Sequence, residues 1–183
     1  MLAESYGLDF YRIYGAVTQE YPRMRSFARA GFAAGPCLLK DTLQLSAFAS
    51  NNFFLGHAAM LVNEGLPNFI VTQLRGEGLS KSTVAILGMA FKGDSDDNRS
   101  SLSYKLKKLL QVEARNVLCT DPFISDPRFV SLEEAVEQAD VIVLGSPHSA
   151  YRGLKFRAGK KVVDIWGFWR EDQKKADLTE GTK

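Results

Sequence analysis

The sequence predicts an α/β protein in which a doubly wound parallel sheet follows a region of long apolar helices. Four short apolar runs occur in the second half of the chain, at residues 83–88, 116–122, 140–145 and 161–165. Buried strands that alternate with helices are typical of a parallel sheet covered on both faces. The first half lacks such runs and shows helical periodicity instead. We therefore expect a helical region over residues 1–75 and a Rossmann-like domain over residues 76–183.

The composition is that of a soluble globular protein. The chain has 183 residues, of which 45% are apolar and 24% charged, and its formal net charge is +2. This charge is too small to favour nucleic acid or a membrane surface as a partner. No run of 18 apolar residues and no signal-like N-terminus occur, and two cysteines cannot build a disulfide framework. These features predict a cytoplasmic protein in a reducing environment.

The first half is expected to contain three helices and one shaped loop. An apolar face predicts a helix within residues 2–21, and the glycines and proline of residues 31–37 predict a loop. Asp41 and Thr42 are N-cap candidates for a long apolar helix, and Pro67 suits the first turn of the helix after it. Helices this apolar favour a buried spine or a subunit interface.

The second half alternates strands and helices. Residues 75–78 have the composition of a linker, and residues 100–112 predict an amphipathic helix after the first strand. Ser131 and Glu134 form a capping-box pattern at the start of another helix. The charged segment after Trp169 is expected to be loose.

Ligands of open α/β sheets bind beyond the carboxyl ends of the strands. The segment after the first strand, residues 88–93, has two glycines, and the chain contains no G-x-G-x-x-G fingerprint. The domain is therefore not expected to bind NAD in the usual manner. Lys92 is a candidate for contact with a nucleotide phosphate or a sugar hydroxyl.

Cys37 is the candidate nucleophile. It lies before a predicted helix, with Lys40 and Asp41 close behind, and both a helix N-terminus and an ammonium group favour a thiolate. Asp41 could cap the helix, hold Lys40 or orient a water molecule. The alternative is a cysteine that only packs in a turn, as most free cysteines do. Cys119 and His148 are expected to be structural, and no cluster has the spacing of metal ligands.

Two segments together resemble one enzyme family. Residues 31–42, GFAAGPCLLKDT, resemble the G-F-G-G-x-C-x-x-K-D signature of nucleotide-sugar 6-dehydrogenases, and residues 91–99, FKGDSDDNR, resemble that family's F-K-x-x-T-x-D-x-R motif. The family includes the UDP-glucose, UDP-N-acetylmannosamine and GDP-mannose dehydrogenases. The resemblance covers nearly the whole chain but only the family's central and C-terminal parts. The NAD-binding domain and the upstream catalytic Lys and Asn are expected to be missing.

The resemblance implies a two-step oxidation of the sugar C6 alcohol to a carboxylate, with two hydride transfers to NAD. Cys37 would capture the intermediate aldehyde as a thiohemiacetal, whose oxidation gives a thioester that water hydrolyses. Asp41 would position that water, and Lys40 would lie near the nicotinamide and favour the thiolate.

The resemblance also implies binding residues. The substrate-cradling loop corresponds to Ala28, Arg29, Ala30, Gly31, Phe32, Ala33 and Ala34. Two alanines there replace the family's Gly-Gly pair, which restricts φ. Phe91 and Lys92 would contact the nucleotide sugar, and Arg99 would reach NAD together with Cys37 and Lys40. Either Arg23 or Arg25 could reach a neighbouring subunit's sugar.

Two interpretations follow. In the first, the chain is a piece of an NAD-dependent nucleotide-sugar dehydrogenase that acts on a UDP-hexose, dimerises through the helix from about Asp41 to Leu74, and is inactive alone. In the second, it is a non-catalytic module for nucleotide-sugar binding and dimerisation.

Overall fold

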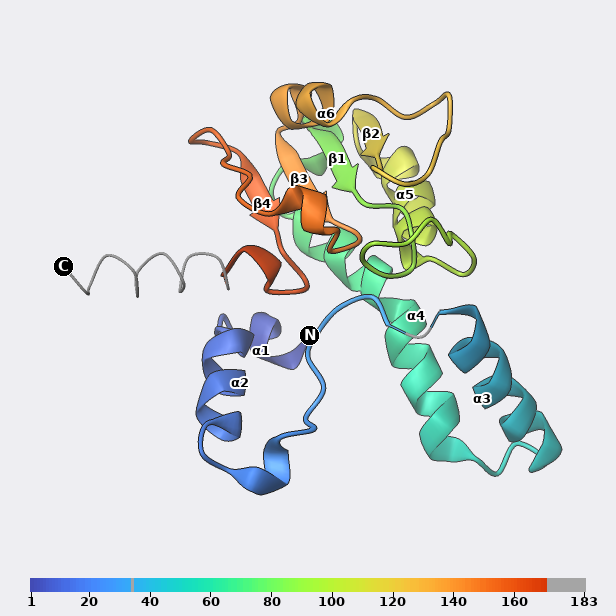
Figure 1. Cartoon of the computed structure of the whole chain (residues 1–183). Helices are drawn as coiled ribbons and strands as arrows, with labels where there is room; N and C mark the ends of the chain where they lie inside the picture. The colour runs from blue at the N-terminus through green and yellow to red at the C-terminus, as the bar shows by residue number, and fades with distance from the viewer. Residues whose placement is uncertain (34, 171–183) are drawn as a thin grey trace. The chain divides into compact units, whose positions relative to one another are not determined.

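The structure, a computed structural model, describes residues 1–33 and 35–170 (Figure 1). These residues form two compact units, residues 1–31 and the residues from Phe32 onward. Ala34 and the C-terminal segment expected to be loose lie outside the described residues, apart from Arg170.

The first unit contains two short helices where the sequence predicts one. They are α1 (Leu2–Ser5) and α2 (Phe10–Thr18), followed by the 3₁₀ turn η1 (Pro22–Met24). Gly7, at φ +65°, separates the helices, and the Asp9 carboxylate caps α2 by accepting the N–H groups of Tyr11 and Arg12 at 2.9 and 3.2 Å. Tyr14 ties the unit together, because its ring stacks on Phe27 and its hydroxyl donates to the Phe27 carbonyl at 3.0 Å.

The second unit begins with a helical hairpin, α3 (Pro36–Phe48) and α4 (Phe54–Arg75). The prediction of one long helix capped by Asp41 or Thr42 is wrong. The helix starts at Pro36, a residue that favours the first helical position, so Asp41 lies inside it. The chain then reverses through Ser50 and Asn51, both at positive φ.

Pro67 lies inside α4, so the prediction that it begins a new helix is also wrong. Tertiary contacts of α4 outweigh the loss of the helical hydrogen bond that Pro67, which has no backbone N–H, cannot donate. The next turns of α4 place Ile70, Val71 and Leu74 in the core, and the Lys105 ammonium donates to the Glu64 carbonyl of α4 at 2.6 Å. The helix therefore continues to Arg75, which pairs with Glu113.

A four-stranded parallel sheet follows, in the order β2-β1-β3-β4. Its strands are β1 (Thr83–Leu87), β2 (Asn116–Thr120), β3 (Val141–Leu144) and β4 (Lys161–Val163). The connections between the strands contain α5 (Leu102–Glu113), α6 (Leu132–Gln138) and the 3₁₀ turn η3 (Ser149–Tyr151), and a second 3₁₀ turn, η2 (Leu79–Lys81), precedes β1. All four predicted strands are present, and the predicted α/β class with a parallel sheet is confirmed.

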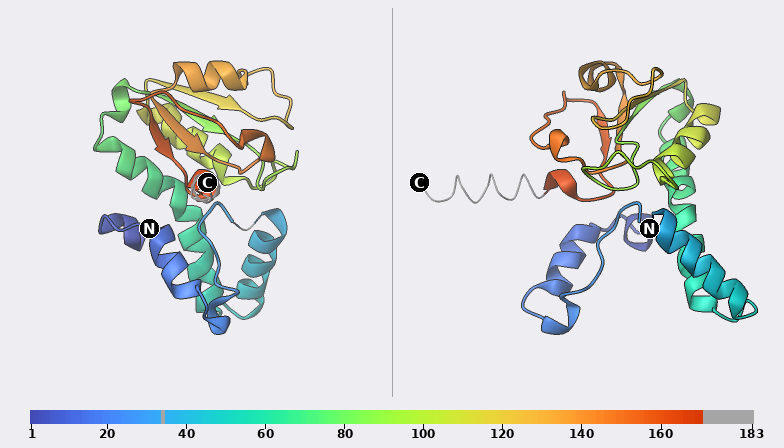
Figure 2. Two further views of the ribbon diagram at one scale, coloured as in Figure 1. Left: turned by 60° about the vertical axis from the view of Figure 1, so that its left-hand side comes forward. Right: turned by 45° about the vertical axis from the view of Figure 1, so that its right-hand side comes forward.

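Both faces of the sheet are covered (Figure 2). Val84 and Ile86 of β1 pack with α4 and α5, whereas Ala85 and Leu87 pack on the opposite face with α6 and the aromatic residues after β4. The predicted cap of α6 also forms, since the Ser131 hydroxyl accepts the Glu134 N–H at 3.1 Å.

Candidate functional site

The strand order places the topological switch point between β1 and β3, because β1 connects to β2 on one side and the chain then crosses to β3 on the other. Here the loops after β1 and β3 meet backbone to backbone. A Cβ on Gly88 would lie 2.6 Å from the Ser146 carbonyl oxygen, and one on Gly145 would lie 2.4 Å from the Gly88 carbonyl oxygen. Only glycine fits at either position. The side chains available to a ligand therefore lie further along the β1–α5 loop, residues 88–101.

The structure brings the two motifs together. A Cβ on Gly35 would lie 2.4 Å from Phe91 Cδ2, so the Phe91 ring rests directly on the backbone that begins α3. Cys37, the second residue of α3, is exposed. The pKa of Arg99 is raised mainly by its bonds to Asp97 and slightly by its interaction with Cys37, so Arg99 and Cys37 lie within electrostatic range of each other.

Arg99 is oriented by Asp97. The guanidinium donates to both carboxylate oxygens, with Nε–Oδ1 at 2.9 Å and Nη2–Oδ2 at 2.7 Å. These bonds hold the pKa of Asp97 at about 2. The Phe91 N–H donates to the Asp97 carbonyl at 3.0 Å, which closes the loop on itself. The aspartate and arginine of the second motif thus form one internal pair.

The two lysines of the predicted site are both exposed. Lys40 Nζ lies 3.2 Å from Asp41 Oδ1 on α3, so of the roles open to Asp41, holding Lys40 is the one that this contact matches. Lys92 Nζ lies 5.6 Å from the centre of the Phe91 ring, and its charge helps to lower the pKa of Asp97.

The residues expected to cradle the substrate fall in different places. Ala28, Arg29, Ala30 and Gly31 belong to the first unit, where the Arg29 guanidinium lies 5.5 Å from the Tyr14 ring. Phe32 is only 3% exposed and packs in the core of the second unit. Ala33 is exposed, and Ala34 lies outside the described residues. Their binding roles stay predictions.

Sequence reasoning missed a buried network at the ends of β2 and β3. His148 Nε2 lies 3.1 Å from Asp121 Oδ2, and neither side chain is exposed. The same carboxylate oxygen accepts the N–H groups of Met89 and Ala90 at 2.6 and 3.1 Å. Nδ1 of His148 accepts the Asp94 N–H at 2.9 Å. Both residues follow strand ends, which is the one sequence signal that could have singled them out.

Within residues 1–33 and 35–170, no group of three His, Cys, Asp or Glu side chains could hold a metal ion. None of the helices in that part of the chain combines the length and the apolar character that crossing a membrane requires.

A family model described as the UDP-glucose/GDP-mannose dehydrogenase family, UDP binding domain, matches residues 85–171. The chain belongs to the UDP-glucose/GDP-mannose dehydrogenase family. It is 30% identical over 165 residues to the UDP-N-acetyl-D-mannosamine dehydrogenase of Pyrococcus horikoshii, covering 86% of this chain and 39% of that protein. The GDP-mannose 6-dehydrogenase of Pseudomonas putida is 28% identical over 208 residues, covering 98% of this chain and 47% of that protein.

Among solved structures, the UDP-glucose dehydrogenase of Pyrobaculum islandicum superposes with a TM-score of 0.76 at 29% identity, over 93% of this chain and 43% of that one. This family member thus spans less than half the length of the relatives it matches, and it corresponds to their C-terminal part.

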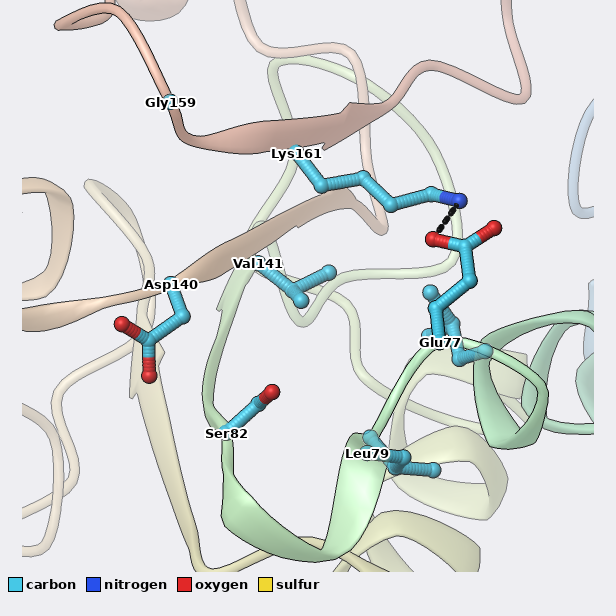
Figure 3. A pocket seen from close by; sticks show the side chains of 8 residues that line it. Glu77, Leu79, Ser82, Asp140, Val141, Gly159 and Lys161 are labelled. Carbon is cyan, nitrogen blue, oxygen red and sulfur yellow. Dashed lines mark hydrogen bonds and ion pairs between the residues drawn. The ribbon is translucent and has the colours of Figure 1, made fainter.

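The family member also has a hollow of about 190 Å³ at the opposite edge of the sheet (Figure 3). Its walls include Ser82 and Asp140, which precede β1 and β3, and Lys161, which begins β4. Lys161 is paired with Glu77 across the hollow. Because parallel sheets bind ligands at their carboxyl edge, we do not assign the nucleotide sugar to this hollow.

Proposed function

We propose that this chain supplies the nucleotide-sugar site and the cysteine nucleophile of a UDP-glucose-type 6-dehydrogenase. That enzyme would oxidise C6 of the sugar from alcohol to carboxylate, in the cytoplasm, for polysaccharide synthesis. The observation that carries the proposal is the convergence of the two motifs, with Phe91 on Gly35 and Arg99 near Cys37. The relatives, named for UDP- and GDP-sugars, support the class of ligand.

Cys37 is placed to capture an aldehyde. Its thiol is exposed in the first turn of α3, at the positive end of the helix dipole, and it lies within electrostatic range of Arg99. In the proposed step, Sγ adds to the C6 aldehyde and the resulting alkoxide takes up a proton, giving a thiohemiacetal. Asp41, one helical turn further along α3, would orient the water that later hydrolyses the thioester, with Lys40 beside it at 3.2 Å.

Bound NAD would supply the oxidising power for both steps, one NAD molecule for each hydride removed. The described residues do not fit its pyrophosphate, because the chain has no G-x-G-x-x-G turn and the backbone at Gly88 packs against Ser146. We expect the purified chain to produce no NADH from any nucleotide sugar, and steady NADH formation would contradict this assignment.

The binding half of the proposal is tested by calorimetry with UDP, UDP-glucose, UDP-N-acetylmannosamine and GDP-mannose. We expect UDP-glucose to bind and Lys92→Ala to weaken it about tenfold, since an ammonium–phosphate contact is worth about 1.5 kcal/mol or more. Lys108→Ala, an exposed lysine on α5, is the matched control and should leave the affinity unchanged. Failure of all four ligands to bind would reject the proposed function.

A non-catalytic binding module is the second candidate, favoured by the poor fit to NAD. The two are separated by comparing UDP-glucose with its C6 aldehyde. If Cys37 is a nucleophile, Cys37→Ala should weaken the binding of the aldehyde about tenfold or more and leave the binding of UDP-glucose unchanged. Equal affinities for the aldehyde in both proteins would favour the module.

We also propose that the chain dimerises through the α3–α4 hairpin. Eight large apolar side chains of this hairpin are between 48% and 90% exposed: Leu38, Leu43, Leu45, Phe48, Phe54, Leu55, Leu61 and Val62. A second copy that presents the same surface would bury it symmetrically. Light scattering should give the mass of a dimer, and Phe54→Glu or Leu61→Glu should give a folded monomer. A monomeric wild-type chain at micromolar concentration would reject the dimer.

A further inference from the structure

The buried Asp121–His148 pair acts on the β1–α5 loop at two points. Asp121 Oδ2 accepts the Met89 and Ala90 N–H groups, which fixes the first residues of the loop. His148 accepts the Asp94 N–H, which fixes its middle. One carboxylate–imidazole pair therefore holds two separate places on the loop that carries the second motif.

These bonds assign the imidazole tautomer. Because Nδ1 accepts the Asp94 N–H at 2.9 Å, it carries no hydrogen. The hydrogen is on Nε2, which donates to Asp121 Oδ2 at 3.1 Å. The His148 ring therefore links Asp121 to the β1–α5 loop through one hydrogen bond on each side.

At its bend, the β1–α5 loop also packs against the two neighbours of His148, Pro147 and Ser149. A Cβ on Gly93 would lie 2.5 Å from the Pro147 carbonyl oxygen. Asp94 has φ +52°, and its Oδ1 accepts the Ser149 N–H and hydroxyl at 2.7 and 2.9 Å. A non-glycine residue in the left-handed region is strained, so the surrounding contacts must hold the bend in place.

We propose that His148, held by Asp121, is a positioning residue that sets where the β1–α5 loop places Phe91, Lys92 and Arg99 around Cys37. This inference rests on the proposed function. A hydrophobic ring could fill the space beside Phe123 and Tyr151, whose ring centres lie 5.1 and 5.5 Å away. Such a ring could neither accept from Asp94 nor donate to Asp121.

Two substitutions separate the two bonds of the ring. Asn at 148 places an amide oxygen near the Nδ1 position, so His148→Asn keeps an acceptor for Asp94 and loses the donor to Asp121. Gln reaches the Nε2 position, so His148→Gln keeps the donor and loses the acceptor. Both remove the aromatic ring, so each is the control for the other in packing.

The first readout needs no ligand. In the wild-type chain, ¹⁵N NMR of the imidazole should show the Nε2–H tautomer, and the Asp94 amide should be protected from hydrogen exchange. We expect His148→Gln to accelerate Asp94 exchange about tenfold or more and His148→Asn to keep most of the protection. An Nδ1–H tautomer in the wild-type chain would overturn the proposal even if the variants fold poorly. Equal exchange of the Asp94 amide in folded His148→Gln and in wild type would also overturn it.

The second readout is UDP-glucose affinity measured by calorimetry. We expect His148→Gln to weaken binding about tenfold and His148→Asn to stay within about threefold of wild type. Equal affinity of folded His148→Gln and wild type would overturn the positioning role. If the wild-type chain binds none of UDP, UDP-glucose, UDP-N-acetylmannosamine and GDP-mannose, the proposed function fails instead, and the positioning role fails with it. The exchange data then still decide whether His148 holds the loop.

Discussion

Replacing Asp121 by Asn should cost about 2–6 kcal/mol of unfolding free energy. Oδ2 accepts two backbone N–H groups at 2.6 and 3.1 Å and His148 Nε2 at 3.1 Å, and Oδ1 accepts two further N–H groups at 2.8 and 3.0 Å. The amide nitrogen of Asn can only donate. Whichever way the amide is turned, at least two backbone N–H groups lose their acceptor, at about 1–3 kcal/mol each. Such a loss is a large part of the 5–15 kcal/mol typical of a domain.

Urea denaturation followed by the fluorescence of Trp166 and Trp169 measures this cost. Asp96→Asn is the matched control, because Asp96 is an exposed carboxylate on the β1–α5 loop, and its substitution should change the stability by less than about 0.5 kcal/mol. A cost below about 1 kcal/mol for Asp121→Asn, or an equal cost for both variants, would refute the reasoning.

The unfolding free energy lost in Asp121→Asn should also depend on pH. Burial alone would raise the pKa of Asp121, but the bonds from His148 and the backbone outweigh it and leave that pKa below its ordinary value. A carboxylate whose pKa is lower in the folded state stabilises that state at pH values above its unfolded pKa of about 3.9. This contribution is lost as the pH falls through the folded pKa. The difference between wild type and Asp121→Asn should therefore be full at pH 7 and shrink below about pH 4. A difference that grows on acidification would contradict the sign.

Three further outcomes are expected. Gly88→Ala should destabilise the fold by about 3 kcal/mol or more, because its Cβ would lie 2.6 Å from atoms just after β3. Gly153→Ala is the control, since Gly153 is also at positive φ but has no atom within 4 Å of the added Cβ, and it should cost only about 1 kcal/mol. Equal melting temperatures of the two variants would contradict this prediction. Native thiol titration at pH 8 should label exposed Cys37 and spare Cys119, whose pKa burial raises to about 11; two rapidly labelled thiols would contradict this. Leu106→Ala should cost about 2–5 kcal/mol in urea denaturation, since that side chain is fully buried, and a cost below about 1 kcal/mol would show a loosely packed core.

Helix boundaries in the first half show where local sequence reasoning failed. Asp41 and Thr42 are good caps by residue type, yet α3 starts at Pro36, and Pro67 lies inside α4. Capping and proline preferences are worth about 1–3 kcal/mol, and packing against the sheet can outweigh them. Ile70, Val71 and Leu74 supply such packing beyond Pro67.

By itself, the sequence determined the four strands, the parallel sheet and the family motifs, because these depend on short patterns of burial and spacing. The tertiary structure decided which of those segments meet. Phe91 lies on Gly35, Arg99 lies near Cys37, and His148 joins Asp121 to the Asp94 N–H. Each of these contacts joins residues far apart in the chain, and only the packing of the helices and loops around the sheet, which no local pattern encodes, brings them together.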